Sequence, residues 1–306
     1  MPFIKIPELS VHYEQMGQGK VPIVFVHGNF ASWRWWRSVF SHLPEHYTAY
    51  LPDLRGCGDT DHTANGYDIE QLATDLHLFI TALNLPSLHL VGHSLGGAVV
   101  QQFTLDHPEC VITLTLVAPA PAEGMSHLKQ EHNSFITGLL ESFEFHALLH
   151  SLHLNRSILL RIFKQMTPSL NHQTADFIAL VDDAARMPPE AIVGFMNSLT
   201  TWNVQNRLNE LSLPVLIIWG EHDTLVKRDA LERMILALQH AQLVILPMVG
   251  HVPQLEQPDS FNQIIFEFIK SNGTSLQNQY SFSTLRTATL PKPSWWQWIK
   301  QKFSAS

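Results

Sequence analysis

Cysteine is scarce in this sequence: Cys57 and Cys110 are the two present among 306 residues. Two cysteines do not make the disulfide framework that stabilises small secreted domains, so a reducing compartment is the simpler interpretation. The N-terminal stretch contains no apolar signal segment. No run reaches the roughly 18 uninterrupted apolar residues of a membrane-spanning helix. We therefore expect a cytoplasmic protein, unless it attaches peripherally to a membrane.

Charge is also sparse, and most of it is negative. Charged residues make up 15% of the chain, with 27 acidic against 19 basic side chains and a net charge of −8. No cluster of Lys and Arg is present, so the basic surface that a nucleic-acid-binding protein needs is missing. Hydrophobic residues, by contrast, make up 45% of the chain. The chain is long enough for one large core, or for a core with an inserted subdomain.

Short apolar runs alternate with helical periodicity over most of the chain. Two runs at the N-terminus predict an opening pair of strands, and the later runs are almost continuously apolar, as strands buried on both faces of a parallel sheet must be. The predicted strands cover residues 3–6, 11–14, 21–26, 48–51, 88–91, 112–117, 215–219 and 243–246. The predicted helices cover residues 68–83, 95–107 and 261–270. This alternation indicates an α/β fold with a doubly wound, mostly parallel sheet.

The alternation of strands and helices stops between residues 120 and 212. That stretch is helical in character and contains no convincing strand. Because the sheet resumes at Val215, we interpret residues 120–212 as a helical cap inserted between two strands. The core then consists of residues 1–119 and 213–271.

The composition changes again in residues 272–306. Ser, Thr, Asn and Gln dominate up to residue 290, which predicts a polar linker. A short amphipathic helix is predicted beyond it, from about residue 295, and it is too short to span a bilayer. The tryptophans that give it an apolar face are Trp295, Trp296 and Trp298. We expect this segment to dock on the rest of the chain, to bind a membrane surface or a partner, or to stay without order.

The strongest chemical signal is the motif GHSLGG at residues 92–97. It matches G-x-S-x-G between a predicted strand and a predicted helix, a turn that exposes the serine at the edge of the sheet. Ser94 is therefore the candidate nucleophile, and the amide of Leu95 at the helix start can face a developing oxyanion. The residues that support this turn are Gly92, His93 and Gly96.

A serine hydroxyl needs a base to act as a nucleophile at neutral pH. Among 18 histidines, His251 stands out because it follows the last predicted strand and precedes the closing helix. Asp223 lies just past the preceding strand and can hold the imidazole tautomer. Glu221 is the rival acid. The chain order serine, aspartate, histidine is the one found with a nucleophile elbow.

With these motifs the chain resembles the capped members of the α/β-hydrolase superfamily, which include esterases, lactonases, epoxide hydrolases and haloalkane dehalogenases. The motifs that carry the resemblance are HGNF at 27–30, DLRGCG at 53–58, the Ser94 turn, WGEHD at 219–223 and GHVP at 250–253. The resemblance implies that His27 and Gly28 lead into a loop whose next residue, Asn29, supplies a second oxyanion amide. Family members often have proline next, where this chain has Phe30. Asp53 and Arg55 match a structural network under the site.

The resemblance also narrows the chemistry. Epoxide hydrolases and haloalkane dehalogenases use a carboxylate nucleophile, whereas a serine at position 94 points to acyl transfer. Relatives that cleave C–C bonds often carry Asn before the serine, and His93 makes that chemistry less favoured here. His146, His150 and His153 share one helical face, but no H-E-x-x-H motif accompanies them, so we predict no metal and no cofactor.

The sequence therefore predicts a carboxylic-ester hydrolase that forms an acyl-enzyme on Ser94. Its expected partner is a small-molecule substrate with a small or medium apolar acyl or alcohol group, because the predicted cap is rich in apolar side chains. These residues are Phe135, Leu139, Leu140, Phe143, Phe145 and Leu148. Hydrolysis of a lactone, a thioester or a C–C bond on the same triad stays open, as does a ligand-sensing protein with slow hydrolysis.

Overall fold

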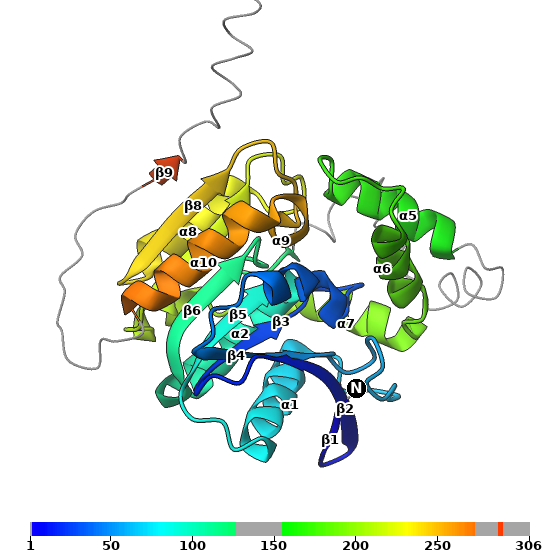
Figure 1. Ribbon diagram of the computed structural model, residues 1–306, viewed down its shortest axis with the longest axis horizontal. Helices are drawn as coiled ribbons and strands as arrows, with labels where there is room; N and C mark the ends of the chain where they lie inside the picture. The colour runs from blue at the N-terminus through cyan, green and yellow to red at the C-terminus, as the bar shows by residue number, and fades with distance from the viewer. Residues whose placement is uncertain (1, 127–154, 273–286, 290–306) are drawn as a thin grey trace, which may run out of the picture.

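The computed structural model describes residues 2–126, 155–272 and 287–289. Its centre is a single twisted sheet. Within those ranges the sheet has nine strands in the order β1-β2-β4-β3-β5-β6-β7-β8-β9 (Figure 1). Their bounds are β1 Phe3–Ile6, β2 Leu9–Met16, β3 Val21–Val26, β4 Tyr47–Pro52, β5 Leu88–His93, β6 Val111–Val117, β7 Val215–Gly220, β8 Ala241–Leu246 and β9 Thr287–Thr289.

Antiparallel pairing is confined to the strands at one edge of this sheet. β1 pairs with β2, and β2 with β4, in antiparallel register. From β4 through β3, β5, β6, β7, β8 and β9, every pairing is parallel. The chain moves outward in one direction from β3 to β4 and in the other from β5 to β6. The predicted doubly wound, mostly parallel sheet is therefore confirmed, and its switch point lies between β3 and β5.

Alternate residues of each buried strand serve opposite faces of the sheet, as the two-residue period of a strand requires. In β3, Val24 and Val26 join the large cluster under α1, α2 and α8, whereas Ile23 and Phe25 join the cluster under η1 and α10. Both faces are thus covered, which explains the continuously apolar strand sequences. The bounds are α1 Ile69–Ala82, α2 Leu95–Asp106, α8 Arg228–Ala237, α9 Pro253–Glu256, α10 Pro258–Asn272, η1 Trp33–Ser41 and η2 Pro108–Cys110.

The insert between β6 and β7 is helical in its described part. It contains α5 Asn155–Met166, α6 Ala175–Ala185, α7 Pro189–Thr201 and η4 Gln205–Glu210. Figure 1 shows α5 and α6 in green, standing apart from the helices that cover the sheet. Apolar residues of α5 and α6 form a separate cluster with Ala31, Trp35 and Val252. Apolar residues of α7 and η4, in contrast, belong to the large cluster of the sheet.

The polar C-terminal segment contributes a short strand to the sheet. Thr287–Thr289 form β9, which pairs in parallel with β8 at the edge of the sheet. The predicted linker role of residues 272–290 stays a prediction. Trp295, Trp296 and Trp298 lie outside the described residues. Within the described ranges, none of the helices is long and apolar enough to cross a membrane.

Candidate active site

Ser94 occupies a strained turn between β5 and α2. Its backbone has φ 52° and ψ −116°, a conformation that a residue with a side chain rarely adopts. The turn is tight because a Cβ at Gly96 would collide with the carbonyl oxygens of Val26 and His27, and a Cβ at Gly92 would collide with that of Gly96. These close approaches explain why glycine occupies both positions of the motif.

The backbone of Ser94 is tied to its surroundings on both sides. Its N–H donates to the carbonyl of Val117 on β6 (3.0 Å), and its carbonyl accepts from the amides of Gly97 (2.9 Å) and Ala120 (3.0 Å). The side chain is half-buried at the carboxyl edge of the sheet. A rigid backbone and an accessible hydroxyl are what a nucleophile requires.

His251 and Asp223, predicted from separate loops, meet at the same edge. The Nδ1 of His251 lies 2.8 Å from Oδ2 of Asp223, and both side chains are buried. The other carboxylate oxygen, Oδ1, accepts from the amides of Leu225 (2.8 Å) and Val226 (3.1 Å). The rival acid Glu221 has no hydrogen bond to His251 among the described residues; its Oε2 accepts from the amide of Met248. The Nε2 of His251 is buried and has no hydrogen-bond partner among the described residues.

His93 joins the Ser94 turn to the His251 loop. Its Nε2–H donates to the carbonyl of His251 (2.9 Å), and the two rings lie 5.0 Å apart. Burial lowers the pKa of His93 well below its usual value, so the ring is neutral and this proton stays on Nε2. The sequence singled out His93 as part of the motif, but its hydrogen bond to a residue 158 positions away could not be read there.

The two predicted oxyanion donors lie at the ends of adjacent strands. Leu95 opens α2 after β5, and Asn29 follows β3, which pairs directly with β5. In the described part of the chain, neither backbone amide has an acceptor. The side chain of Asn29 is engaged on both sides: Oδ1 accepts from the amide of Phe30 (2.8 Å), and Nδ2 lies 3.2 Å from Sδ of Met196 on α7.

Phe30 has φ 57°, in the left-handed region. Proline is fixed near φ −65° and has no N–H, so it fits neither this conformation nor the hydrogen bond to Asn29. A proline at this position would therefore require a different loop conformation.

A buried network around Asp53 supports this loop from the core. Asp53 Oδ1 accepts from the amide of Trp33 (2.7 Å), and Oδ2 lies 2.7 Å from Nδ1 of His12 on β2. His27 donates through Nδ1 to the carbonyl of Gly28 (2.9 Å) and accepts from the amide of Leu54 (3.0 Å). Burial lowers the pKa of His27, which keeps the ring neutral. His12 was not predicted, since nothing marks it in the sequence.

Arg55 completes the predicted structural network. Its guanidinium forms a two-pronged pair with Asp75 of α1, with both N–O distances 2.8 Å. This pair holds the loop after β4 against α1.

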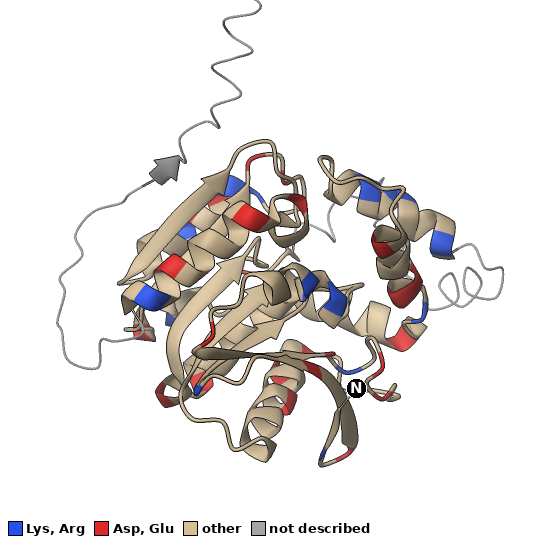
Figure 2. Cartoon of the chain, in the orientation of Figure 1, with Lys and Arg blue, Asp and Glu red and all other residues tan. Residues whose placement is uncertain are grey.

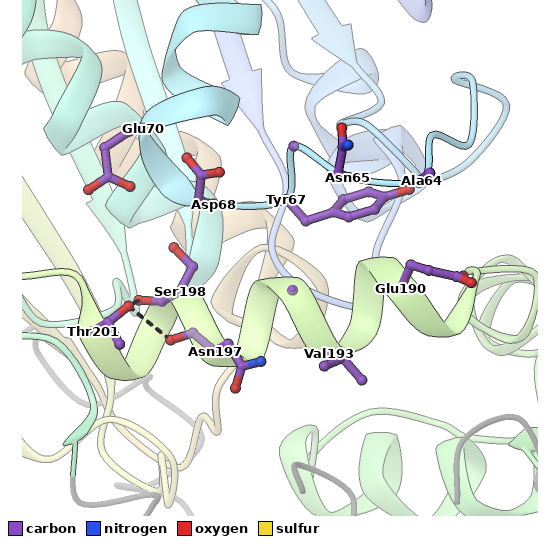
Figure 3. A pocket seen from close by; sticks show the side chains of 12 residues that line it. Ala64, Asn65, Tyr67, Asp68, Glu70, Glu190, Val193, Asn197, Ser198 and Thr201 are labelled. Atoms are coloured by element: carbon purple, nitrogen blue, oxygen red, sulfur yellow. Dashed lines mark hydrogen bonds between the residues drawn. The ribbon is translucent and has the colours of Figure 1, made fainter. Parts of the chain in front are cut away.

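A hollow of about 510 Å³ is present elsewhere in the structure (Figure 3). It lies between the segment 64–70 and α7, and none of the predicted site residues lines it. Asp68, Glu70 and Glu190 are among its lining residues. No group of three His, Cys, Asp or Glu side chains within the described ranges could hold a metal ion. The apolar residues 135–148 and the histidines 146, 150 and 153 fall outside those ranges.

Comparison with known proteins places these motifs in a family. Residues 21–258 match the profile described as the alpha/beta hydrolase fold. A curated relative, the 2-hydroxy-6-oxononadienedioate/2-hydroxy-6-oxononatrienedioate hydrolase of Paraburkholderia phymatum, is 28% identical over 282 residues, which cover 86% of this chain and 91% of the relative. The hydrolase of the same name from Klebsiella pneumoniae is 27% identical over 281 residues, covering 85% and 91%.

Solved structures agree on the fold. A thermophilic esterase from Thermogutta terrifontis superposes with a TM-score of 0.77 at 22% identity, covering 90% of this chain and 100% of the esterase. An enol-lactonase from Burkholderia xenovorans gives a TM-score of 0.73 at 18% identity, covering 88% and 100%. At these identities the likeness concerns the fold.

Proposed function

Because this chain belongs to the α/β-hydrolase family and is a hydrolase, we propose that it cleaves carboxylic esters through an acyl-enzyme formed on Ser94. The observation that carries the proposal is the arrangement of His251, with Nδ1 held by Asp223 and a buried Nε2 left without a partner beside the strained Ser94 turn. Serine activation needs a base that is oriented through Nδ1 and whose Nε2 can accept the hydroxyl proton. The described residues show no hydrogen bond between Ser94 Oγ and this Nε2, a contact that often tightens only when substrate binds.

The chemical steps follow from these positions. Ser94 Oγ attacks the acyl carbon while its proton passes to His251 Nε2, and the amides of Leu95 and Asn29 bind the oxyanion. Collapse of the tetrahedral intermediate breaks the ester bond, and His251 returns the proton to the departing alkoxide. Water then loses a proton to His251 and attacks the acyl-enzyme. Collapse of the second tetrahedral intermediate releases the acid, and His251 returns the proton to Ser94 Oγ. Asp223 stabilises the imidazolium formed in each half of the reaction.

Cleavage of a C–C bond is the second candidate, and the names of the curated relatives favour it. A dienedioate carries two carboxylates, which call for cationic partners. Beside the loop that follows Asn29, Arg34 and Arg186 are already bound to Asp183, and Arg186 also binds Asp59. His93 precedes the nucleophile. These features support an ester with an apolar acyl or alcohol group over a dianion.

Two substrates of opposite character test the proposal. Purified protein is assayed with p-nitrophenyl butyrate and with 2-hydroxy-6-oxononadienedioate, and in parallel it is labelled with a fluorophosphonate. We expect kcat/KM to be higher for the ester, one labelled residue, and loss of both activity and labelling in Ser94→Ala. Preferred turnover of the dienedioate would assign the second candidate, and wild-type labelling of Ser94→Ala would remove Ser94 from the mechanism.

A further inference from the structure

The loop that carries Asn29 is held from two directions. From the core, Asp53 accepts the amide of Trp33, as described above. From the insert, Asp183 of α6 reaches the preceding residue, with Oδ2 accepting from Oγ of Ser32 at 2.6 Å. Ser32 is buried and caps η1, because its Oγ also accepts from the amide of Arg34.

Asp183 is built to hold this position. Its side chain is 7% exposed, and the same Oδ2 accepts from Nη1 of Arg34 (3.2 Å) while Oδ1 accepts from Nη2 of Arg186 (2.8 Å). Two guanidiniums thus compensate the buried carboxylate, which keeps it an acceptor for Ser32. Arg186 extends the network to Asp59 (2.9 Å), whose amide binds Asp53. The insert and the core therefore share one hydrogen-bonded network around the loop.

Apolar packing also joins this loop to the insert. Ala31 and Trp35, on either side of Ser32, belong to the apolar cluster with residues of α5 and α6. Figure 2 shows acidic residues on α6 and basic residues on α5 and on η1, which carries Arg34 and Arg37. The described contacts of α6 with the core thus include this loop and the helix that follows it.

We propose that Asp183 is a positioning residue. Through its hydrogen bond to Ser32, α6 holds the Asn29 amide in the geometry that binds the oxyanion. This inference rests on the proposed function. Removal of one oxyanion donor costs about 10²–10³ in kcat, so a donor that is displaced but present costs less, on the order of tenfold to a hundredfold.

The test compares an ester with its thionoester. Sulfur is a poorer hydrogen-bond acceptor than oxygen, so the ratio of kcat/KM for p-nitrophenyl butyrate to that for its thiono analogue reports how well the oxyanion donors are placed. In Asp183→Ala we expect kcat to fall at least tenfold, KM to change less than threefold, and the ratio to fall with kcat. Asp183→Asn retains an acceptor for Ser32 and should recover part of the ratio.

The matched control lies on the same two elements. Asp176 of α6 pairs with Arg37 of η1 at 2.8 Å, but the side chains are 79% and 61% exposed. Such a pair contributes little, so Asp176→Ala should keep the wild-type ratio. Ser32→Ala breaks the contact from the core side and decides the case if Asp183→Ala fails to fold. It should lower the ratio, and the double variant should lower it no further.

Fluorophosphonate labelling of Ser94 gives a readout without turnover, since the phosphonyl oxygen also occupies the oxyanion site. We expect the labelling rate to fall in Asp183→Ala and Ser32→Ala. Wild-type ratios and labelling rates in both variants, with an active wild type, would overturn the inference alone. A wild type that neither hydrolyses esters nor reacts with the probe would overturn the proposed function and the inference with it.

Discussion

At the scale of single residues, the pairing of His251 with Asp223 makes the acid assignment testable. Asp223→Asn keeps the size of the side chain but removes the carboxylate that orients Nδ1–H, so the imidazole loses its productive tautomer. By analogy with serine proteases, we expect ester hydrolysis to fall by about 10⁴. Steady-state kinetics with p-nitrophenyl butyrate measure the change.

Glu221→Gln is the matched control for this substitution. The side chain lies two residues from Asp223 and contacts the amide of Met248. We expect its rate to stay within about threefold of wild type, since surface substitutions rarely matter more. A dead Glu221→Gln variant beside an active Asp223→Asn variant would show that the acid has been assigned to the wrong residue.

Phe30 gives a second prediction at this scale. Its positive φ is incompatible with the proline that related sequences often have here, and a proline would also remove the N–H that binds Asn29. We expect Phe30→Pro to slow fluorophosphonate labelling of Ser94 at least tenfold. Phe30→Gly keeps the backbone conformation, so it should label faster than the proline variant. Equal labelling of the two would show that the loop conformation does not matter.

What the sequence reveals at the residue scale depends on how local the signal is. Ser94 and Leu95 form one motif, and Asp223 and His251 each follow a strand end, so the pattern places them. The contact of His12 with Asp53 joins residues 41 apart, and that of Ser32 with Asp183 joins residues 151 apart. No spacing rule connects such partners. They are found by three-dimensional packing alone.

At the scale of elements, the insert consists of two parts with different attachments. Phe195 of α7 is fully buried in the large cluster of the sheet, and its ring centroid lies 5.5 Å from that of Tyr67. Phe177 of α6 is 2% exposed but belongs to the separate cluster with α5. A substitution of Phe195 should therefore affect the stability of the whole sheet, whereas a substitution of Phe177 should affect the stability of the α5–α6 pair.

We therefore predict different consequences for two alanine substitutions of similar chemistry. Phe195→Ala should lower the free energy of unfolding by about 3–5 kcal/mol, as for other buried phenylalanines, and speed amide exchange in α1 and α2. Phe177→Ala should speed exchange in α5 and α6 while leaving α1 and α2 protected. Hydrogen-exchange mass spectrometry separates the two. Identical exchange patterns would mean that the insert and the sheet open together.

Elements with a strong apolar period were predictable, and those without one were not. All eight predicted strands are present, and in the central parallel strands burial on both faces explains the continuously apolar sequence. Helix α8 was missed because only Ala230, Leu231 and Met234 are buried in it, too few to show a period. Strand β9 is a polar triplet whose only signature is its backbone pairing with β8.

At the scale of the whole molecule, buried histidines link stability to pH. His89 of β5 is 1% exposed, and its Nδ1 lies 2.8 Å from Oγ1 of Thr113. Burial lowers its pKa from 6.5 to about 4. Burial also lowers the pKa of His27 and His93. All three therefore favour the neutral ring in the folded state.

The direction of the effect follows from proton binding. Between pH 4 and 6.5 the unfolded chain binds a proton at His89 that the folded chain does not, so the free energy of unfolding rises with pH across this window. The contribution is complete above pH 6.5 and is lost as the pH falls towards 4. A shift of this size corresponds to roughly 3 kcal/mol, and His27 and His93 add to it with the same sign.

His89→Gln tests this linkage, because the amide can still pair with Thr113 but binds no proton. Urea unfolding between pH 5 and 7 should show a shallower rise of stability with pH than in wild type, by up to one proton in the slope. His62→Gln removes an exposed histidine and should leave the slope unchanged. An unaltered slope in His89→Gln, with the two-state transition preserved, would mean that His89 titrates alike in the folded and unfolded chains.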